Sequence, residues 1–473
     1  MSEEANPALQ RAMQSVAAAS AKAAADPARP SYHFRPPAQW MNDPNGVIYH
    51  AGWYHLFYQH NPYGDDWGHM HWGHARSRDL VVWEQLPIAL WPSLERNEEH
   101  CFSGCAALTG QGQPILLYTS VHGTAENRLP NEQWAALGSP DWIGWQKHPA
   151  NPILALASQG GPPFEGDWRD PFLFHEAGRT FLVLGGNFAE TAAVALYEAL
   201  DDTLSRWRYC GLLYQQPRQQ AGFLECPNFV RLGERWILLT SPYRPVEYVT
   251  GRFDLATLSF TPEQSGVLDP GASTVPNYYA TNILFAESGQ CILLGWVRGF
   301  PAGRGWNGCL ALPRILTLGA DGRPRQHPIP GLAHLRQQAY TLRGFALDGS
   351  APGLAGVQGD ALELLLRVNG GGARQIVVQL RRSDDGERAV EIRYDGAHLT
   401  VAGTEVALTV GDEPLDLHLF LDKSVLEVFA QDGRVAVTRV IDAPPADQGV
   451  ALVATGGAAH VDELQIWTMG SIW

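Results

Sequence analysis

The sequence predicts an all-β protein in which a β-propeller is followed by a β-sandwich, with a short helical arm at the N-terminus. Three observations support this fold class. Short apolar segments alternate with turns that use many of the 49 Gly and 33 Pro residues, and related strand–turn–strand units recur along the chain. The composition also changes near residue 335, and 473 residues are too many for one ordinary domain.

The predicted helical arm spans residues 1–30. Residues 8–25 are rich in Ala, Gln and Lys, which favour a helix, and Pro27 and Pro30 end it. The arm begins with acidic residues, and Arg11 interrupts its apolar part, so it lacks the pattern of a secretory signal peptide. We therefore expect a cytoplasmic protein.

The predicted propeller spans residues 31–335 and contains three related units. Each unit has an acid followed closely by Pro, a strand, a Gly turn eight or nine residues after the acid, and an apolar strand. The acids are Asp43, Asp170 and Glu225. The innermost strands of a propeller surround one axis, so we expect these acids to point into one axial pocket. The alternative is that the acid–Pro pairs only mark turns between surface hairpins.

The predicted sandwich spans residues 340–473. Trp, frequent earlier in the chain, is absent from this segment until Trp467, and apolar and polar residues alternate. This alternation is typical of antiparallel strands that bury one face in a two-sheet sandwich. Asp422 and Glu427 lie within such strands, and no convergent partner is evident for them. We therefore interpret the segment as a structural module.

Charge and composition exclude several classes of partner. The formal net charge of −15 argues against a surface that neutralises nucleic-acid phosphates or anionic lipids. No segment approaches the roughly 18 apolar residues of a membrane-spanning helix. The six Cys are scattered and form no Cys-x-x-Cys motif, so a zinc ribbon is not expected. The expected partner is a small molecule, and the oligomeric state is left open.

Paired carboxylates in an aromatic pocket are the groups that hydrolyse glycosides, because one must be ionised and the other must carry a proton. Glu225 lies in an apolar stretch that should raise its pKa, so it is the better candidate for the acid/base. Asp43 lies between Asn42 and Asn45, whose amides should keep it ionised, as a nucleophile requires.

The third acid has a basic neighbour. Asp170 follows Arg169, whose guanidinium should hold the aspartate in its charged form. Sugar rings also stack on flat aromatic faces. The tryptophans near the three acids that could supply such faces are Trp40, Trp67, Trp72 and Trp168.

Several sequence blocks resemble glycoside hydrolase family 32, the β-fructofuranosidases, and occur in the order of that family. The blocks are WMNDPNG (40–46), YQHNPYGDDWGHMHWGHARSRDLVVWE (58–84), FSG (102–104), WRDP (168–171), ECP (225–227), GWNGCLALPR (305–314) and LDKSVLEVFAQDG (421–433). The resemblance implies a five-bladed propeller followed by a sandwich. It also implies retaining hydrolysis of terminal β-fructofuranosyl units, in sucrose, sucrose phosphate or short fructo-oligosaccharides, without a cofactor or a metal.

The resemblance also implies roles for single residues. Asp43 would be the nucleophile, Asp170 the transition-state stabiliser and Glu225 the acid/base. The residues that would contact the fructosyl group are Asn42, Gln59, Trp67, Phe102, Ser103 and Arg169. Two alternatives use the same acids, namely a fructosyltransferase and a fructan exohydrolase. A third alternative, from another class, is a carbohydrate-binding propeller without catalysis.

The sequence departs from the family pattern at three positions. Leu224 stands where an aromatic Trp commonly precedes the acid/base, Asn277 stands where an Asp is usual, and Cys105 stands where a second Ser is common. We expect Leu224 and Asn277 to shape the leaving-group side of the pocket. Recognition of a phosphate there would need a cation, and the candidates are Arg244, Arg298 and Arg304.

Two other motifs resemble ligand-binding sites but are better explained without a ligand. His69, His71 and His74 have a spacing that metal ligands can show, but they lie in a Trp- and Gly-rich block of a family that binds no metal. The glycines at 303, 305 and 308 match a nucleotide-binding pattern, but no strand–helix unit follows them. We expect neither a metal site nor a nucleotide site.

Overall fold

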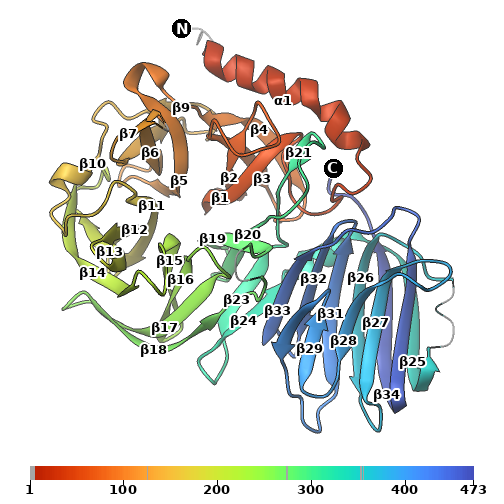
Figure 1. Cartoon of the computed structure of the whole chain (residues 1–473). Helices are drawn as coiled ribbons and strands as arrows, with labels where there is room; N and C mark the ends of the chain where they lie inside the picture. The colour runs from red at the N-terminus through yellow and green to blue at the C-terminus, as the bar shows by residue number, and fades with distance from the viewer. Residues whose placement is uncertain (1–5, 125, 273–274, 352–353, 355) are drawn as a thin grey trace.

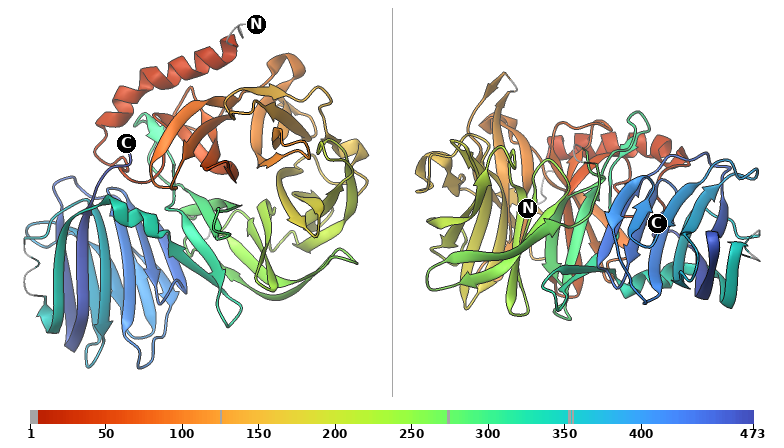
Figure 2. Two further views of the ribbon diagram at one scale, coloured as in Figure 1. Left: turned by 180° about the vertical axis from the view of Figure 1, so that it is seen from behind. Right: turned by 60° about the horizontal axis from the view of Figure 1, so that its bottom comes forward.

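The computed structural model describes residues 6–124, 126–272, 275–351, 354 and 356–473. A ring of β-sheets lies beside a β-sandwich, and one helix runs along the outside of the ring (Figure 1). Both views in Figure 2 show the sandwich attached to one side of the ring. The predicted fold class, a propeller followed by a sandwich, is confirmed. Residues 1–5 of the predicted arm lie outside the described residues.

The predicted helix of the arm is α1 (Pro7–Ala25). Asn6 caps its N-terminus, because the Asn6 side chain accepts a hydrogen bond from a backbone N–H of the first turn. Val16 is buried on the face that packs against the ring. After the helix, the Asp26 carboxylate accepts a hydrogen bond of 2.8 Å from the indole of Trp306. No helix in the described part of the chain is long and apolar enough to cross a membrane.

Five sheets form the blades of the propeller, each with four antiparallel strands in its main path. The first contains β1 (Gln39–His50), β2 (Trp53–Asn61), β3 (His71–Ser77) and β4 (Trp83–Leu90), with β21 (Trp306–Asn307) beside β1. The second contains β5 (Glu98–Leu108), β6 (Pro114–Thr124), β8 (Glu132–Gly138) and β10 (Leu154–Ala155), with β7 (Asn127–Arg128) and β9 (Trp145–Lys147) attached.

The other blades follow in chain order around the ring. The third contains β11 (Arg169–Glu176), β12 (Arg179–Phe188), β13 (Thr191–Ala199) and β14 (Trp207–Pro217). The fourth contains β15 (Glu225–Leu232), β16 (Arg235–Ser241), β17 (Glu247–Asp254) and β18 (Ser259–Val267). The fifth contains β19 (Tyr278–Phe285), β20 (Cys291–Val297), β23 (Arg314–Leu318) and β24 (Pro324–Pro328), with β22 (Cys309–Leu310) attached. The 3-10 helices are η1 (Leu94–Arg96), η2 (Leu156–Ser158) and η3 (Pro330–Leu335).

The innermost strand of every blade has an irregularity in its pairing near its start. The register shifts fall between Met41 and Pro44, Cys101 and Gly104, Arg169 and Phe172, Glu225 and Asn228, and Tyr279 and Asn282. Such bulges bend the strand and redirect the side chains beside them. At three of them a non-glycine residue has a positive φ, 65° at Asp170, 46° at Cys226 and 47° at Ala280.

The sandwich is one hydrogen-bonded sheet that folds over on itself. Its strands are β25 (Arg336–Ser350), β26 (Ala361–Asn369), β27 (Gln375–Arg382), β28 (Val390–Tyr394), β29 (His398–Val401), β30 (Thr404–Ala407), β31 (Leu415–Asp422), β32 (Val425–Ala430), β33 (Val435–Val440) and β34 (Gly449–Met469). In β34, residues 449–455 pair with β27 and residues 460–468 pair with β26. The strand passes from one layer to the other near Gly457, whose φ of 145° and approach to a backbone oxygen leave no room for a Cβ.

Asp422 and Glu427 were expected to lack convergent partners, and this expectation is wrong. Both are fully buried between the sandwich and the propeller. Asp422 accepts hydrogen bonds from the backbone N–H and the ring of His33, and Glu427 contacts the other ring nitrogen at 3.0 Å. Arg314 donates to Glu427 at 2.5 Å and to Asp269 at 3.0 Å. Local sequence patterns do not predict this cluster, because its members are far apart in the chain.

The imidazole of His33 is charged at neutral pH in this cluster. Burial opposes the charge, but the hydrogen bonds to Asp422 and Glu427 outweigh it and raise the pKa of His33 to about 9. The folded pKa therefore lies above the ordinary value of 6.5. The stability contributed by the protonated ring is complete below about pH 6.5 and is lost as the pH rises through about 9.

We predict that His33→Gln lowers the free energy of unfolding by about 3 kcal/mol near pH 6 and by less as the pH approaches 10. Urea unfolding of both proteins between pH 6 and 10 measures this difference, and the exposed His334→Gln is the control. A difference that stays constant across this range would contradict the assignment of a protonated His33.

Candidate active site

One cavity of about 350 Å³ lies among the innermost strands of the propeller. All nine residues that the sequence analysis proposed for the site line it: Asn42, Asp43, Gln59, Trp67, Phe102, Ser103, Arg169, Asp170 and Glu225. The three acids therefore share one cavity although they are far apart in the chain. The interpretation of the acid–Pro pairs as surface turns is wrong.

The bulges explain why residues from different blades meet here. Each bulge has one or two of the site residues at it or beside it. These residues are Asn42 and Asp43 in β1, Phe102 and Ser103 in β5, Arg169 and Asp170 in β11, Glu225 in β15, and Tyr279 in β19. Each of these residues lines the cavity. A local deviation that recurs in all five blades therefore directs a polar or aromatic side chain toward the same space.

Both oxygens of the Asp43 carboxylate accept hydrogen bonds. The Ser103 hydroxyl donates at 2.5 Å, and the Asn42 amide donates at 2.9 Å. Burial raises the pKa of Asp43, and these two hydrogen bonds act against the rise. Asn45, expected to help keep Asp43 ionised, instead accepts a hydrogen bond from the backbone N–H of Gly104.

Asp170 is buried, and its electrostatics differ from the expectation. Burial raises the pKa of Asp170 to about 7, because repulsion from Glu225 and Asp43 adds to it and the Arg169 charge compensates only in part. The Arg169 Nε lies 3.8 Å from the Asp170 carboxylate. The Arg169 charge lowers the pKa of Asp170, as expected, but it does not offset the effect of burial. The backbone N–H of Cys226 donates to Asp170 at 3.0 Å.

The polar end of Arg169 is directed at Glu225 instead. Its Nη2 donates to the Glu225 carboxylate at 2.7 Å and to the Tyr243 hydroxyl at 2.6 Å. The other Glu225 oxygen lies 2.6 Å from the hydroxyl of Tyr279. The apolar neighbour Leu224 is buried in the core and does not line the cavity. The carboxyl group of Glu225 thus has polar contacts, although its neighbours in the sequence are apolar.

Further cavity residues were missed, and some tryptophans were misplaced. Trp72 and Trp168 are fully buried in the propeller core, whereas Trp40 and Trp67 do line the cavity. The lining residues that the sequence analysis did not assign to the fructosyl site are Tyr243, Tyr279, Trp296 and Arg298. Tyr279 lies at the bulge of the fifth innermost strand, at the place where β1, β11 and β15 have an acid. Extending the repeat to the fifth blade would have identified it.

The three histidines of the possible metal motif do not converge. His71 hydrogen-bonds the backbone oxygen of His69 at 2.5 Å, and His74 contacts the ring of His55 at 3.1 Å. The ring of His74 also stacks on Phe57. Within the described residues, no group of three or more His, Cys, Asp or Glu side chains could hold a metal ion.

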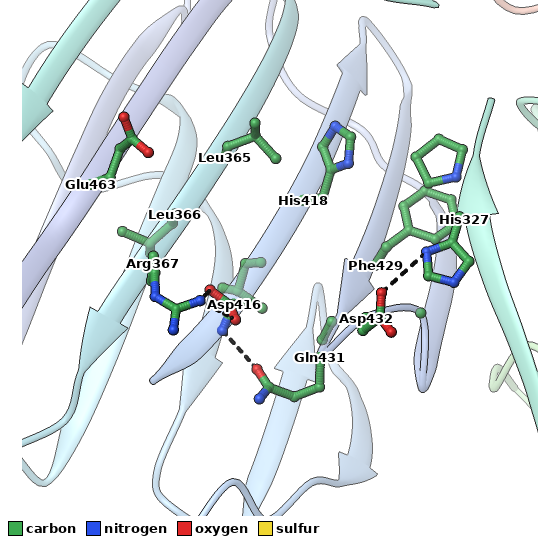
Figure 3. A pocket seen from close by; sticks show the side chains of 14 residues that line it. His327, Leu365, Leu366, Arg367, Asp416, His418, Phe429, Gln431, Asp432 and Glu463 are labelled. Atoms are coloured by element: carbon green, nitrogen blue, oxygen red, sulfur yellow. Dashed lines mark hydrogen bonds and ion pairs between the residues drawn. The ribbon is translucent and has the colours of Figure 1, made fainter. Parts of the chain in front are cut away.

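A second hollow, of about 390 Å³, lies on the sandwich next to β24 (Figure 3). Its acids are paired with neighbours rather than with one another. Asp416 contacts Arg367 at 2.9 Å, and Asp432 lies 3.7 Å from His327. Glycoside hydrolysis needs two carboxyl groups that flank one bond. Three carboxyl groups line the propeller cavity together, whereas the acids of the larger hollow in Figure 3 are paired with basic neighbours.

Two family models match consecutive parts of the chain. Residues 33–328 match the glycosyl hydrolases family 32 N-terminal domain, and residues 331–468 match the glycosyl hydrolases family 32 C-terminal domain. Together the two models cover the propeller and nearly all of the sandwich.

Two curated relatives match over almost their whole length. The chain is 31% identical to a sucrose-6-phosphate hydrolase from Zymomonas mobilis over 93% of this chain and 92% of that protein. It is 28% identical to an extracellular exo-inulinase from Aspergillus awamori, over 94% of this chain and 95% of that protein.

Solved structures agree in fold over nearly all of the chain. A mutant of a Bombyx mori family 32 β-fructofuranosidase in complex with sucrose has a TM-score of 0.84 and 27% identity, and the match covers 99% of each chain. A sucrose-6-phosphate hydrolase from Lactobacillus gasseri also has a TM-score of 0.84 and 27% identity, over 98% of this chain and 97% of that one. On the evidence of the two family models and these relatives, the chain belongs to glycosyl hydrolase family 32.

Proposed function

We propose that this protein is a retaining β-fructofuranosidase that hydrolyses terminal β-fructofuranosyl units of sucrose, sucrose phosphate or short fructo-oligosaccharides. The observation that carries the proposal is the meeting of Asp43, Asp170 and Glu225 in one aromatic-lined cavity. The relatives named above include two sucrose-6-phosphate hydrolases, a β-fructofuranosidase and an exo-inulinase, all of which act on fructosides.

In the first step, a carboxylate oxygen of Asp43 attacks C2 of the fructosyl unit while Glu225 gives its proton to the glycosidic oxygen. The bond between C2 and the leaving sugar breaks as the bond to Asp43 forms. Glu225 then takes a proton from water, and the resulting hydroxide attacks C2. Fructose leaves, Asp43 regains its charge, and Glu225 is protonated again.

Arg169 suits both halves of this cycle. When Glu225 loses its proton to the leaving group, a carboxylate forms 2.7 Å from the Arg169 guanidinium, which stabilises the new charge. Arg169 also reduces the repulsion among the three acids. Asp170 would accept hydrogen bonds from fructosyl hydroxyl groups and stabilise the positive charge that develops at the ring.

A cytoplasmic location also belongs to this proposal. All six cysteines are unpaired, and five of them are buried. Scattered, unpaired cysteines suit a reducing compartment, where disulfides are rare.

We predict that the purified protein hydrolyses sucrose and 1-kestose. For each bond cleaved, one molecule of free fructose and one molecule of the leaving sugar should appear. The substrates are compared by chromatography at low and high concentration. Fructosylated oligosaccharides as the main product would instead indicate transfer to a sugar hydroxyl, and no turnover of any fructoside would contradict the proposed function.

We predict that Asp43→Ala lowers kcat by about 10⁴-fold or more, because no covalent intermediate can form. Glu225→Ala should lower it by about 10²- to 10⁴-fold, because proton transfer is lost. Added azide should rescue Glu225→Ala and give a fructosyl azide with the β configuration. The exposed Asp384→Ala is the control, and an α product or near-normal activity of either variant would show the roles to be wrong.

We predict that Asp170→Asn makes the protein more stable while it lowers activity. The folded pKa of Asp170 is raised, so its charge destabilises the fold fully above about pH 7 and not at all below about pH 3.8. Thermal unfolding should show a gain on the order of 2 kcal/mol at pH 8 that disappears toward pH 4. Asp384→Asn is the matched control, and a less stable Asp170→Asn protein at pH 8 would refute the raised pKa.

A further inference from the structure

One wall of the active-site cavity faces the leaving sugar. The acid that protonates the glycosidic oxygen must lie beside the leaving group, so the leaving sugar lies on the side of Glu225. Tyr279 is next on this wall, with its hydroxyl 2.6 Å from Glu225. The guanidinium carbon of Arg298 lies 5.4 Å from the centre of the Tyr279 ring and 4.8 Å from that of Trp296. Arg298 therefore lies beyond Glu225, where the leaving sugar would be.

The structure separates the three arginines that are candidates for binding a phosphate. The Arg244 side chain already has protein partners, because it pairs with Glu247 at 2.7 Å and donates a hydrogen bond to the backbone oxygen of Gln220. Arg304 lies 3.7 Å from Asp26 and lines a different hollow, near the helical arm. Of the three, only Arg298 lines the cavity that holds the acids.

The Arg298 side chain has no acidic partner among the described residues, and no hydrogen bond from its guanidinium to them is formed. Its backbone is fixed on both sides by Asn277, which accepts from the Arg298 N–H at 2.9 Å and donates to its carbonyl at 2.8 Å. Asn277 stands where the family pattern has an aspartate, so this neighbour adds no negative charge. The guanidinium is held against two rings with its donors free.

The other arginine of the cavity differs in this respect. Arg169 contacts three carboxylates, Glu225 at 2.7 Å, Asp167 at 3.2 Å and Asp170 at 3.8 Å. Its charge is balanced within the protein. Arg298 is thus the cation in this cavity that a ligand can still neutralise.

We propose that Arg298 binds an anionic group on the leaving sugar, a phosphate ester, and that it makes the enzyme prefer phosphorylated fructosides over neutral ones. The inference rests on the proposed fructosidase function. The three acids of the cavity repel an anionic substrate, and a guanidinium offers two parallel hydrogen bonds that match a phosphate. A half-buried position on aromatic faces strengthens these bonds relative to bulk water.

The experiment compares kcat/KM for sucrose 6-phosphate with kcat/KM for sucrose in the same protein. We expect the wild-type ratio to exceed one and to fall about 10- to 100-fold in Arg298→Gln, mainly through the KM of the phosphorylated substrate. Arg298→Lys should recover part of the ratio, because it keeps the charge but not the paired donors. Arg304→Gln is the matched control and should leave the ratio unchanged.

A second measurement uses only the wild-type protein and so does not depend on the folding of a variant. Added NaCl should lower kcat/KM for sucrose 6-phosphate more than for sucrose. An equal loss of kcat/KM for both substrates in Arg298→Gln, or a wild-type ratio near one without a difference in salt dependence, overturns the proposal and leaves the fructosidase function standing. Failure of the wild-type protein to hydrolyse either sugar would instead overturn the proposed function.

Discussion

Everything that this protein can do with a sugar depends on a backbone irregularity that recurs in each blade. In a regular strand, successive side chains point to opposite faces of the sheet, and few of them reach the axis of the ring. The bulge near the start of each innermost strand changes this geometry. Positive φ angles at Asp170, Cys226 and Ala280 show that the backbone is strained at three of these points. The surrounding sheets hold this strain in place.

The bulges bring three carboxyl groups together, and the electrostatics of the cavity follow from that proximity. Burial and mutual repulsion raise the pKa of Asp170 to about 7, while one arginine, Arg169, is shared among the acids. The close approach of these acids therefore lowers the stability of the folded protein, as is common at sites where charged groups are brought together for catalysis. Tyr279 and Ser103 complete the arrangement by hydrogen-bonding single oxygens of the acids.

The sequence predicted what depends on local pattern. The acid–Pro units identified three innermost strands, and the family blocks named nine residues that line one cavity. It could not predict features that depend on packing between distant segments. The polar surroundings of Glu225 come from the third and fifth blades, and Trp168 packs in the core of the propeller whereas Trp40 lines the cavity. The partners of Asp422 were missed because they lie almost 400 residues away in the chain.

That last contact has a consequence for biosynthesis. The first strand of the ring follows a segment that Asp422 binds through consecutive backbone N–H groups, and β34, at the end of the chain, supplies both layers of the sandwich. A nascent chain leaving the ribosome therefore carries blade surfaces whose final partners do not yet exist. Pairings of such high sequence separation form late and slowly. Until translation is complete, those surfaces must be shielded by provisional contacts or by chaperones.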